Sequence, residues 1–190
     1  MLRIGTRGRP MVDNPAMRRV LLDQVISTDF GQLDLGWADS FGFDGHFDRF
    51  YGGQVNGLVG ASDPRGVHVN LARRSGGSKV RIELCDHVPD LPEPAWEDVV
   101  EVSVAIPAGA QPRWATWAGE HGGPLPVPTG SYRLRVCANG RDAGRDSEFA
   151  ERVVDFYLLQ LWPGLFEQDA VIRVGSQDAA YWHREVGSRR

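Results

Sequence analysis

The chain has 190 residues, of which 42 % are hydrophobic and 24 % charged, a composition typical of one globular domain. No apolar run approaches the roughly 18 residues that a membrane span requires, and residues 1–15 lack the apolar stretch of a secretory signal. These features argue against a membrane protein, and we expect a cytoplasmic chain with no membrane partner.

The formal net charge of −4 is distributed unevenly along the chain. Residues 1–19 carry a net charge of +4 and residues 183–190 a net charge of +2, which leaves −10 for residues 20–182. An acidic body favours a basic protein partner and argues against nucleic acid, whose binding needs Lys and Arg gathered on one face. Solubility alone is the alternative reason for this charge.

Glycine and proline, 23 and 12 residues respectively, are dispersed along the chain and favour many short strands joined by turns. Residues 1–16 are rich in Gly, Pro and Arg and have no periodicity, which indicates a flexible Arg-rich leader. We expect residues 17–177 to form a single β-sandwich domain. Residues 178–190 are expected to form a weakly ordered C-terminal tail.

In chain order, the first clear strand covers residues 20–35, and Gly31 is expected to break it or to form a bulge. Residues 36–53 are rich in Gly and aromatic side chains without a clean period, which indicates a long loop with aromatic anchors. Residues 54–61 predict a short strand.

Residues 67–73 and 79–85 alternate strictly between apolar and polar side chains, and Ser75-Gly76-Gly77-Ser78 lies between them. This pattern predicts a β-hairpin with its apolar side chains facing the core. His68 and Arg81 fall on the polar side of these strands, so we expect them to face solvent or to pair with side chains on neighbouring strands.

The later strands are predicted at residues 99–106, 131–137 and 153–162, and the last is apolar enough to be a central strand. Arg133 and Arg135 alternate with apolar residues and should face outward. The connecting segments are rich in Gly, Pro or polar residues and predict loops. The fold class is therefore all-β, an antiparallel β-sandwich of about seven to eight strands with long aromatic-bearing loops, and a closed barrel is the alternative.

Catalytic motifs are missing from the sequence. It has no G-x-S-x-G, Walker A or G-x-G-x-x-G pattern, so we expect no enzyme and no cofactor.

Cys85 and Cys137 lie inside strand-like runs and are expected to be buried free thiols. Asp44, His46 and Asp48 place three metal-ligand types within five residues. Because their spacing matches no established metal loop, a polar loop is favoured and no metal is expected.

The most informative segment is an acidic loop stiffened by proline. Seven acidic side chains and no Lys or Arg lie between residues 83 and 101. A rigid acidic loop with an aromatic anchor is a suitable binding surface for a basic protein. The candidate partner-binding residues are Asp90, Glu93, Trp96, Glu97 and Asp98. The alternative is an ordinary solvated loop with its tryptophan folded back onto the sandwich.

Tryptophans near other loops predict a second possible site. Trp37, Trp114 and Trp117 fall in or beside loops and would line an aromatic cleft for a small ligand if those loops met at one end of the sandwich. Capping of the open ends of the core is the alternative role for these side chains.

The order of several segments resembles the competence protein J family. The segments are Asp23-Gln24-Val25-Ile26-Ser27, then Trp37, then Asn56-Gly57-Leu58, then residues 99–104, then Val127-Pro128-Thr129-Gly130-Ser131-Tyr132-Arg133-Leu134. That family includes an inhibitor of the nuclease that acts in DNA uptake. The resemblance implies a small acidic β protein that binds and blocks a nuclease. Together with the acidic body and the acidic loop, it predicts an inhibitor or immunity-type protein whose basic partner is a nuclease or toxin.

Overall fold

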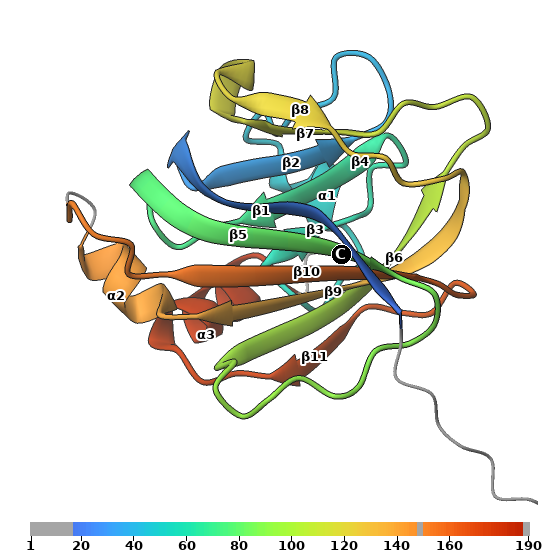
Figure 1. Cartoon of the computed structure of the whole chain (residues 1–190). Helices are drawn as coiled ribbons and strands as arrows, with labels where there is room; N and C mark the ends of the chain where they lie inside the picture. The colour runs from blue at the N-terminus through green and yellow to red at the C-terminus, as the bar shows by residue number, and fades with distance from the viewer. Residues whose placement is uncertain (1–16, 148–149, 188–190) are drawn as a thin grey trace, which may run out of the picture.

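The computed structural model describes residues 17–147 and 150–187, which fold into two facing β-sheets (Figure 1). The larger sheet has six strands in the order β1-β5-β10-β9-β6-β11, and the smaller has five in the order β3-β4-β2-β7-β8. The larger sheet comprises β1 (Arg18–Asp29), β5 (Ser75–Cys85), β10 (Phe156–Pro163), β9 (Gly130–Asn139), β6 (Asp98–Ile106) and β11 (Ala170–Arg173). The smaller comprises β3 (Val59–Gly60), β4 (Gly66–Asn70), β2 (Gln32–Gly36), β7 (Arg113–Thr116) and β8 (Gly122–Pro124).

The core lies between the two sheets and is built from the apolar sides of their strands. Val80 and Ile82 of the larger sheet and Val67 and Val69 of the smaller sheet are buried in one hydrophobic cluster. Full burial of such a side chain contributes about 1.5–3 kcal/mol relative to exposure, so these alternating stripes supply the main drive for the two sheets to face each other. The predicted two-sheet β architecture is confirmed.

Two details of the predicted sandwich are wrong. The described residues form eleven strands, and the larger sheet is mixed because β5 and β10 run parallel. β3 lies within the short strand predicted for residues 54–61. The unpredicted strands β7, β8 and β11 contain only three or four residues each, which is too short to show an alternating pattern. The predicted central position of residues 153–162 is confirmed by β10, which lies between β5 and β9.

The predicted hairpin of residues 67–85 is also wrong, because its two strands belong to different sheets. β4 pairs with β2 and β3, whereas β5 pairs with β1 and β10. The predicted turn residues lie in β5, where Ser75 pairs with Asp29 of β1. Alternation identifies the buried face of a strand, but two strands that bury facing stripes can lie in one sheet or in opposite sheets.

Gly31 ends the first strand, as predicted. Phe30 and Gly31 both have positive φ, 57° and 63°, so the chain leaves the larger sheet after β1 and enters the smaller sheet as β2. A Cβ at residue 31 would lie 2.4 Å from the carbonyl oxygen of Leu71, so the close approach requires glycine there.

Residues 36–53 cover the outer face of the smaller sheet and contain a short helix, α1 (Phe47–Tyr51). Phe50 and Tyr51 are buried in a second hydrophobic cluster. Phe43 stacks on the ring of His68 at 4.0 Å, and His68 Nδ1 lies 2.9 Å from the Asp34 carboxylate. His68 is therefore buried and not at the solvent side, because this aromatic segment covers its side of the sheet. Its contact with Asp34 on the neighbouring strand β2 confirms the cross-strand alternative.

Helices occur at the C-terminal end of the described chain. α2 (Arg141–Asp146) replaces part of a predicted polar loop, and α3 (Gln177–Glu185) forms where a weakly ordered tail is predicted. Ser176 caps α3 by accepting a hydrogen bond from the backbone N–H of Ala179, at 3.0 Å. A 3-10 turn, η1 (Trp117–Gly119), joins β7 and β8. None of the helices in residues 17–147 and 150–187 has the length and apolar character that a membrane span requires.

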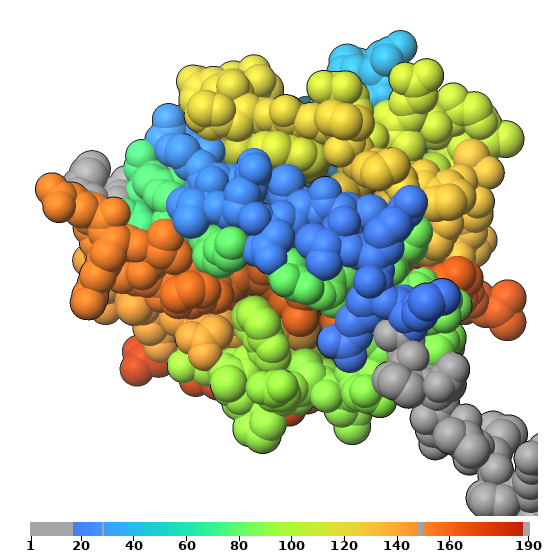
Figure 2. Space-filling model, in the orientation of Figure 1, coloured from blue at the N-terminus to red at the C-terminus, as the bar shows by residue number. Residues whose placement is uncertain are grey.

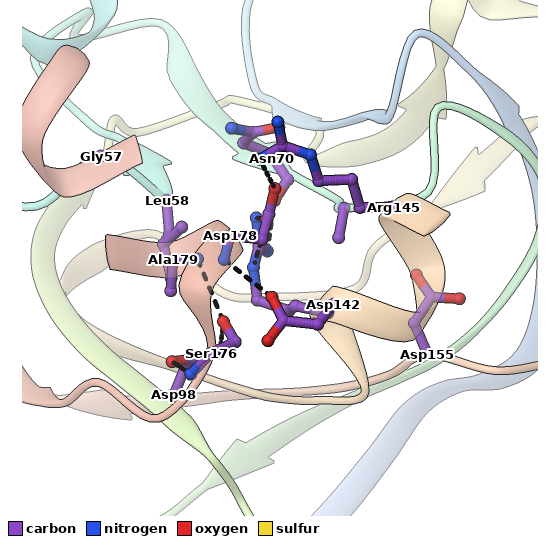
Figure 3. A network of polar contacts seen from close by, with 12 residues as sticks. Gly57, Leu58, Asn70, Asp98, Asp142, Arg145, Asp155, Ser176, Asp178 and Ala179 are labelled. Carbon is purple, nitrogen blue, oxygen red and sulfur yellow. Dashed lines mark hydrogen bonds and ion pairs between the residues drawn. The ribbon is translucent and has the colours of Figure 1, made fainter. Parts of the chain in front are cut away.

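A buried ion pair joins α2 and α3 (Figure 3). Nε and Nη2 of Arg141 donate to one carboxylate oxygen of Asp178, at 3.0 and 2.6 Å, while Nη1 donates to the backbone carbonyl of Asn70 at 2.8 Å. Both side chains are almost fully buried. One guanidinium group therefore ties both helices to β4, which explains why residues 177–185 fold onto the sandwich.

Replacing Arg141 tests how much its guanidinium group stabilises the contact between the two helices and β4. Arg141→Met should lower the free energy of unfolding by about 3–5 kcal/mol, because Asp178 would remain buried without its main partner. Urea denaturation followed by tryptophan fluorescence measures the loss. Arg145→Met is the matched control: its side chain is 52 % exposed and 3.5 Å from the same carboxylate, so the loss should stay below about 1 kcal/mol. Equal losses in the two variants would contradict this role for Arg141.

We expect His183 of α3 to make the free energy of unfolding depend on pH. Its Nδ1 accepts a hydrogen bond from the backbone N–H of Gly57 at 3.0 Å, and burial, with the nearby Arg141 charge, lowers the pKa of the imidazole below 6.5. The unfolded chain therefore takes up a proton at a higher pH than the folded chain, and stability is lost as the pH falls below about 6.5. His183→Asn should show a smaller loss than the wild type when urea unfolding is compared at about pH 7.5 and about pH 5.5. Parallel losses would show that His183 is not responsible.

Candidate protein-binding surface

The acidic loop, residues 86–97, joins β5 to β6 and lies against the outer face of the larger sheet (Figure 1). β10 and β9 separate β5 from β6 in that sheet, so the loop has to span both strands. Its underside is close to β9, because Arg135 of β9 hydrogen-bonds to two of its backbone carbonyls. The loop is therefore a layer over the sheet, with one side inward and one toward solvent.

Two arginines fix the backbone of this loop. Nη1 of Arg135 donates to the carbonyl oxygens of Asp90 at 2.8 Å and Pro89 at 3.3 Å. Nη1 of Arg173 on β11 donates to those of Trp96 at 2.6 Å and Glu93 at 3.0 Å. Because these guanidinium groups bind carbonyl oxygens of the loop, its carboxylates remain available to face outward.

Two arginines of β9 lie on the outer side of the strand as predicted, but they are not exposed to solvent. Arg133 and Arg135 are buried rather than exposed, and both bind Glu101 of β6. Arg135 Nε lies 2.8 Å from one carboxylate oxygen of Glu101, and Arg133 Nη2 lies 3.2 Å from the other. The alternation of β9 is as predicted, but loops cover its polar side, so these charges must be paired and hydrogen-bonded. Arg81, by contrast, pairs with Asp23 across strands at 2.7 Å, as predicted.

The five predicted partner-binding residues do not share one environment. Asp90, Glu93 and Glu97 are exposed and Trp96 is half-buried, whereas Asp98 is fully buried. Asp98 accepts hydrogen bonds from the hydroxyl of Ser176 at 2.6 Å and from the backbone N–H of Gly175 at 2.8 Å (Figure 3). Asp98 therefore anchors the start of α3 and cannot contribute to a surface.

The remaining carboxylates differ in how far they are engaged within the molecule. Glu97 accepts a hydrogen bond from the backbone N–H of Gly140 at 2.9 Å. Asp90 makes a long contact of 3.9 Å with Arg18, and its side chain is 83 % exposed. Glu93 is exposed and holds the loop through its backbone carbonyl. Asp90 and Glu93 are thus the carboxylates best placed to meet another molecule.

The three tryptophans of the predicted ligand cleft are not brought together. Trp37 and Trp114 are buried in the main core, and the indole N–H of Trp37 donates to the Pro64 carbonyl at 2.8 Å. Trp117 is exposed and packs against Phe30 with ring centroids 5.1 Å apart. A groove of about 770 Å³ borders Trp37, but neither of the other tryptophans lines it.

The segment with Asp44, His46 and Asp48 is held by its own contacts. Asp44 accepts from the backbone N–H of His46 at 3.1 Å and pairs with Arg49 at 2.9 Å. The hydrogen bond from His46, together with the Arg49 charge, lowers the pKa of the Asp44 carboxyl. In the part of the chain that the structure describes, no group of three His, Cys, Asp or Glu side chains is placed to hold a metal ion.

Both cysteines are buried free thiols, as predicted. Burial raises the pKa of the Cys137 thiol to about 12 and also raises that of Cys85. The thiolate is the reactive form of cysteine, so these groups are inert packing residues near neutral pH.

Comparison with known proteins identifies the architecture. The crystal structure of ComJ, inhibitor of the DNA-degrading activity of NucA, from Bacillus subtilis, superposes with a TM-score of 0.56 over 78 % of this chain and 100 % of that chain. This chain has the fold of ComJ. The two sequences are 15 % identical, so the resemblance predicted from the sequence is confirmed at the level of the fold.

A second solved structure, described as crocagin biosynthetic gene J, has a TM-score of 0.49 at 16 % identity and covers 78 % of this chain and 99 % of that chain. The sequence matches no protein-family model and no curated protein. The described residues of this chain share the ComJ fold, and the arginine-held acidic loop is their candidate binding feature.

The hydrogen bonds from Arg135 to the backbone of the acidic loop should make that loop rigid. Arg135→Met should raise amide hydrogen exchange in residues 88–92 by about tenfold or more, because a hydrogen bond to a charged group contributes roughly 1.5–3 kcal/mol. Hydrogen exchange followed by mass spectrometry measures the change. Arg113→Met, at an exposed arginine of β7, should leave exchange in that loop unchanged. If these amides exchange in Arg135→Met as slowly as in the wild type, the hydrogen bonds from Arg135 do not make the loop rigid.

Proposed function

We propose that this chain is a non-catalytic inhibitor that binds a basic nuclease and blocks its access to DNA. The observation that supports this proposal is the acidic loop, whose backbone is hydrogen-bonded to Arg135 and Arg173 while Asp90 and Glu93 point to solvent. The printed description of ComJ names it an inhibitor of the DNA-degrading activity of NucA, which makes a nuclease the first partner to consider.

A nuclease cleft that binds the DNA backbone has to present positive charge to phosphate. Exposed carboxylates compete for the same charge, and a net charge of −10 over residues 20–182 steers such a partner toward the chain. The hydrogen bonds that fix the loop lower the entropy cost of binding, because the carboxylates are already held in place in the free protein.

Inhibition of DNA cleavage is the direct test of this function. Purified chain should reduce the degradation of linear duplex DNA in an extract of the cells that produce it, and the affected nuclease can then be purified with the chain as bait. Binding should weaken steeply from about 50 to about 500 mM salt, since exposed charge pairs are screened. Undiminished DNA degradation at saturating chain would exclude the proposed function.

Charge reversal in the acidic loop tests its role. Asp90→Lys combined with Glu93→Lys should raise the concentration of chain needed for half-inhibition by about tenfold or more at low salt, because both contacts become repulsive. The matched control is Glu120→Lys with Asp146→Lys, which changes the net charge equally at exposed positions outside the loop. Equal weakening in the two double variants would mean that total charge, and not this loop, determines binding.

A further inference from the structure

The loop between β10 and β11, residues 164–169, carries two large apolar side chains into solvent. Leu165 is 85 % exposed and Phe166 is 80 % exposed, which are the highest values for large hydrophobic residues in the described chain. They are adjacent in sequence and form one apolar tip, which we call the Leu165–Phe166 tip. Contiguous apolar surface of this kind commonly marks an interaction site.

This loop is held in place by hydrogen bonds to its backbone. Arg133 Nη1 donates to the carbonyl oxygens of Glu167 and Gln168 at 3.1 and 3.3 Å. The hydroxyl of Ser103 accepts a hydrogen bond from the backbone N–H of Glu167 at 2.9 Å. One carboxylate oxygen of Asp169 accepts hydrogen bonds from the backbone N–H groups of residues 55 and 56, which precede β3, both at 2.8 Å. The tip is therefore presented by a fixed backbone and is not exposed through fraying.

The tip and the acidic loop are held by neighbouring parts of one polar network. Arg133 holds the tip loop and Arg135 holds the acidic loop, and these two residues lie on the same side of β9 with Glu101 bound between them. Figure 2 shows both segments on one face of the molecule, the acidic loop in green and the tip loop in orange-red at the edge of the view. The exposed carboxylate of Glu167 adjoins the tip itself.

The surface on either side of Phe166 is hollowed. One hollow of about 360 Å³ lies toward Gly53 and Gln54, and another of about 220 Å³ lies toward Pro64 and Tyr132, and Phe166 lines both. A raised apolar side chain between two depressions has the relief that interdigitates with a second protein surface.

We propose that the Leu165–Phe166 tip is the apolar anchor of the docking surface, inserted into an apolar pocket of a basic protein partner whose positive rim meets Asp90, Glu93 and Glu167. This inference rests on the proposed function for the identity of that partner as a nuclease. Charge complementarity favours a basic partner over a second copy of this acidic chain, because two copies would bring like charges together around the tip.

The anchor and the carboxylates have different physical roles in this arrangement. Long-range attraction between the carboxylates and the partner speeds association and is weakened by salt. Burial of the apolar tip slows dissociation and depends little on salt, as for the aromatic and aliphatic anchors that dominate many interfaces. The two contributions are therefore separable by measuring rates.

The test compares the wild type with Leu165→Ala/Phe166→Ala against the nuclease purified through the inhibition assay. The double variant should dissociate about tenfold to hundredfold faster, with its association rate and the salt dependence of that rate unchanged. Because both side chains are exposed, its melting temperature should equal that of the wild type. Surface plasmon resonance and a thermal melt provide these readouts.

Phe30→Ala is the matched control. Phe30 is 58 % exposed and follows Asp29, which pairs with Ser75, whereas the tip follows Pro163, which pairs with Tyr132 at the other end of the larger sheet. This variant should dissociate at the wild-type rate. Loss of binding in both variants would indicate a general effect of removing surface aromatic groups and would overturn the proposal.

The outcomes also separate this inference from the proposed function. A wild-type chain that inhibits no nuclease overturns both proposals. A wild-type chain that inhibits, together with a double variant that dissociates at the same rate, overturns only the apolar anchor. Sedimentation that shows a wild-type dimer and a monomeric double variant would assign the tip to a second copy of the chain and overturn the basic partner.

Discussion

The organisation of the molecule depends on guanidinium groups that are buried beneath loops and hydrogen-bonded to backbone carbonyls. Arg133 and Arg135 lie on the outer side of β9, where alternation places polar residues, and both bind Glu101. Glu101 balances part of their charge, and Nη1 of each arginine donates to backbone carbonyls of the loops that cover them. A buried charge left without such partners would be strongly destabilising, so covering this face requires the loops to adopt these positions.

Because many charged side chains are buried, the formal net charge does not describe the charge of the surface. Arg73, Arg133, Arg135 and Arg141 are all buried, and each donates to at least one backbone carbonyl. Their positive charges count in the formal net charge but contribute little to what an approaching molecule meets, whereas Asp90 and Glu93 are exposed. Carboxylates are buried as well, among them Asp98 beside the loop, so the balance of buried charges does not make the surface acidic. The negative charge that the acidic loop presents comes from its own exposed side chains, Asp90 and Glu93.

Local patterns predicted the strands but not the way in which they assemble. The alternation of residues 99–106 and the break at Gly31 correspond to β6 and to the junction of β1 and β2. The hairpin prediction failed because the alternation of residues 67–73 and 79–85 fits paired strands and facing strands equally well. His68 and Arg135 lie on the polar side of their strands as expected, but their burial depends on loops distant in sequence.

The candidate site follows the same division between local and distant information. Acidic composition located the loop, and Asp90 and Glu93 are exposed within it. Asp98 is instead buried, because its carboxylate accepts hydrogen bonds from the backbone N–H and the hydroxyl of Ser176, 78 residues later. Residues 164–169 carry no charge pattern that would mark them as a binding surface. A Leu-Phe pair in a sequence more often predicts buried core residues than an exposed tip. Hydrogen bonds that join the backbone of this loop to Arg133 and Ser103 are among the contacts that hold the pair at the surface. A rigid β framework thus presents both proposed binding elements through contacts that single-sequence patterns do not encode.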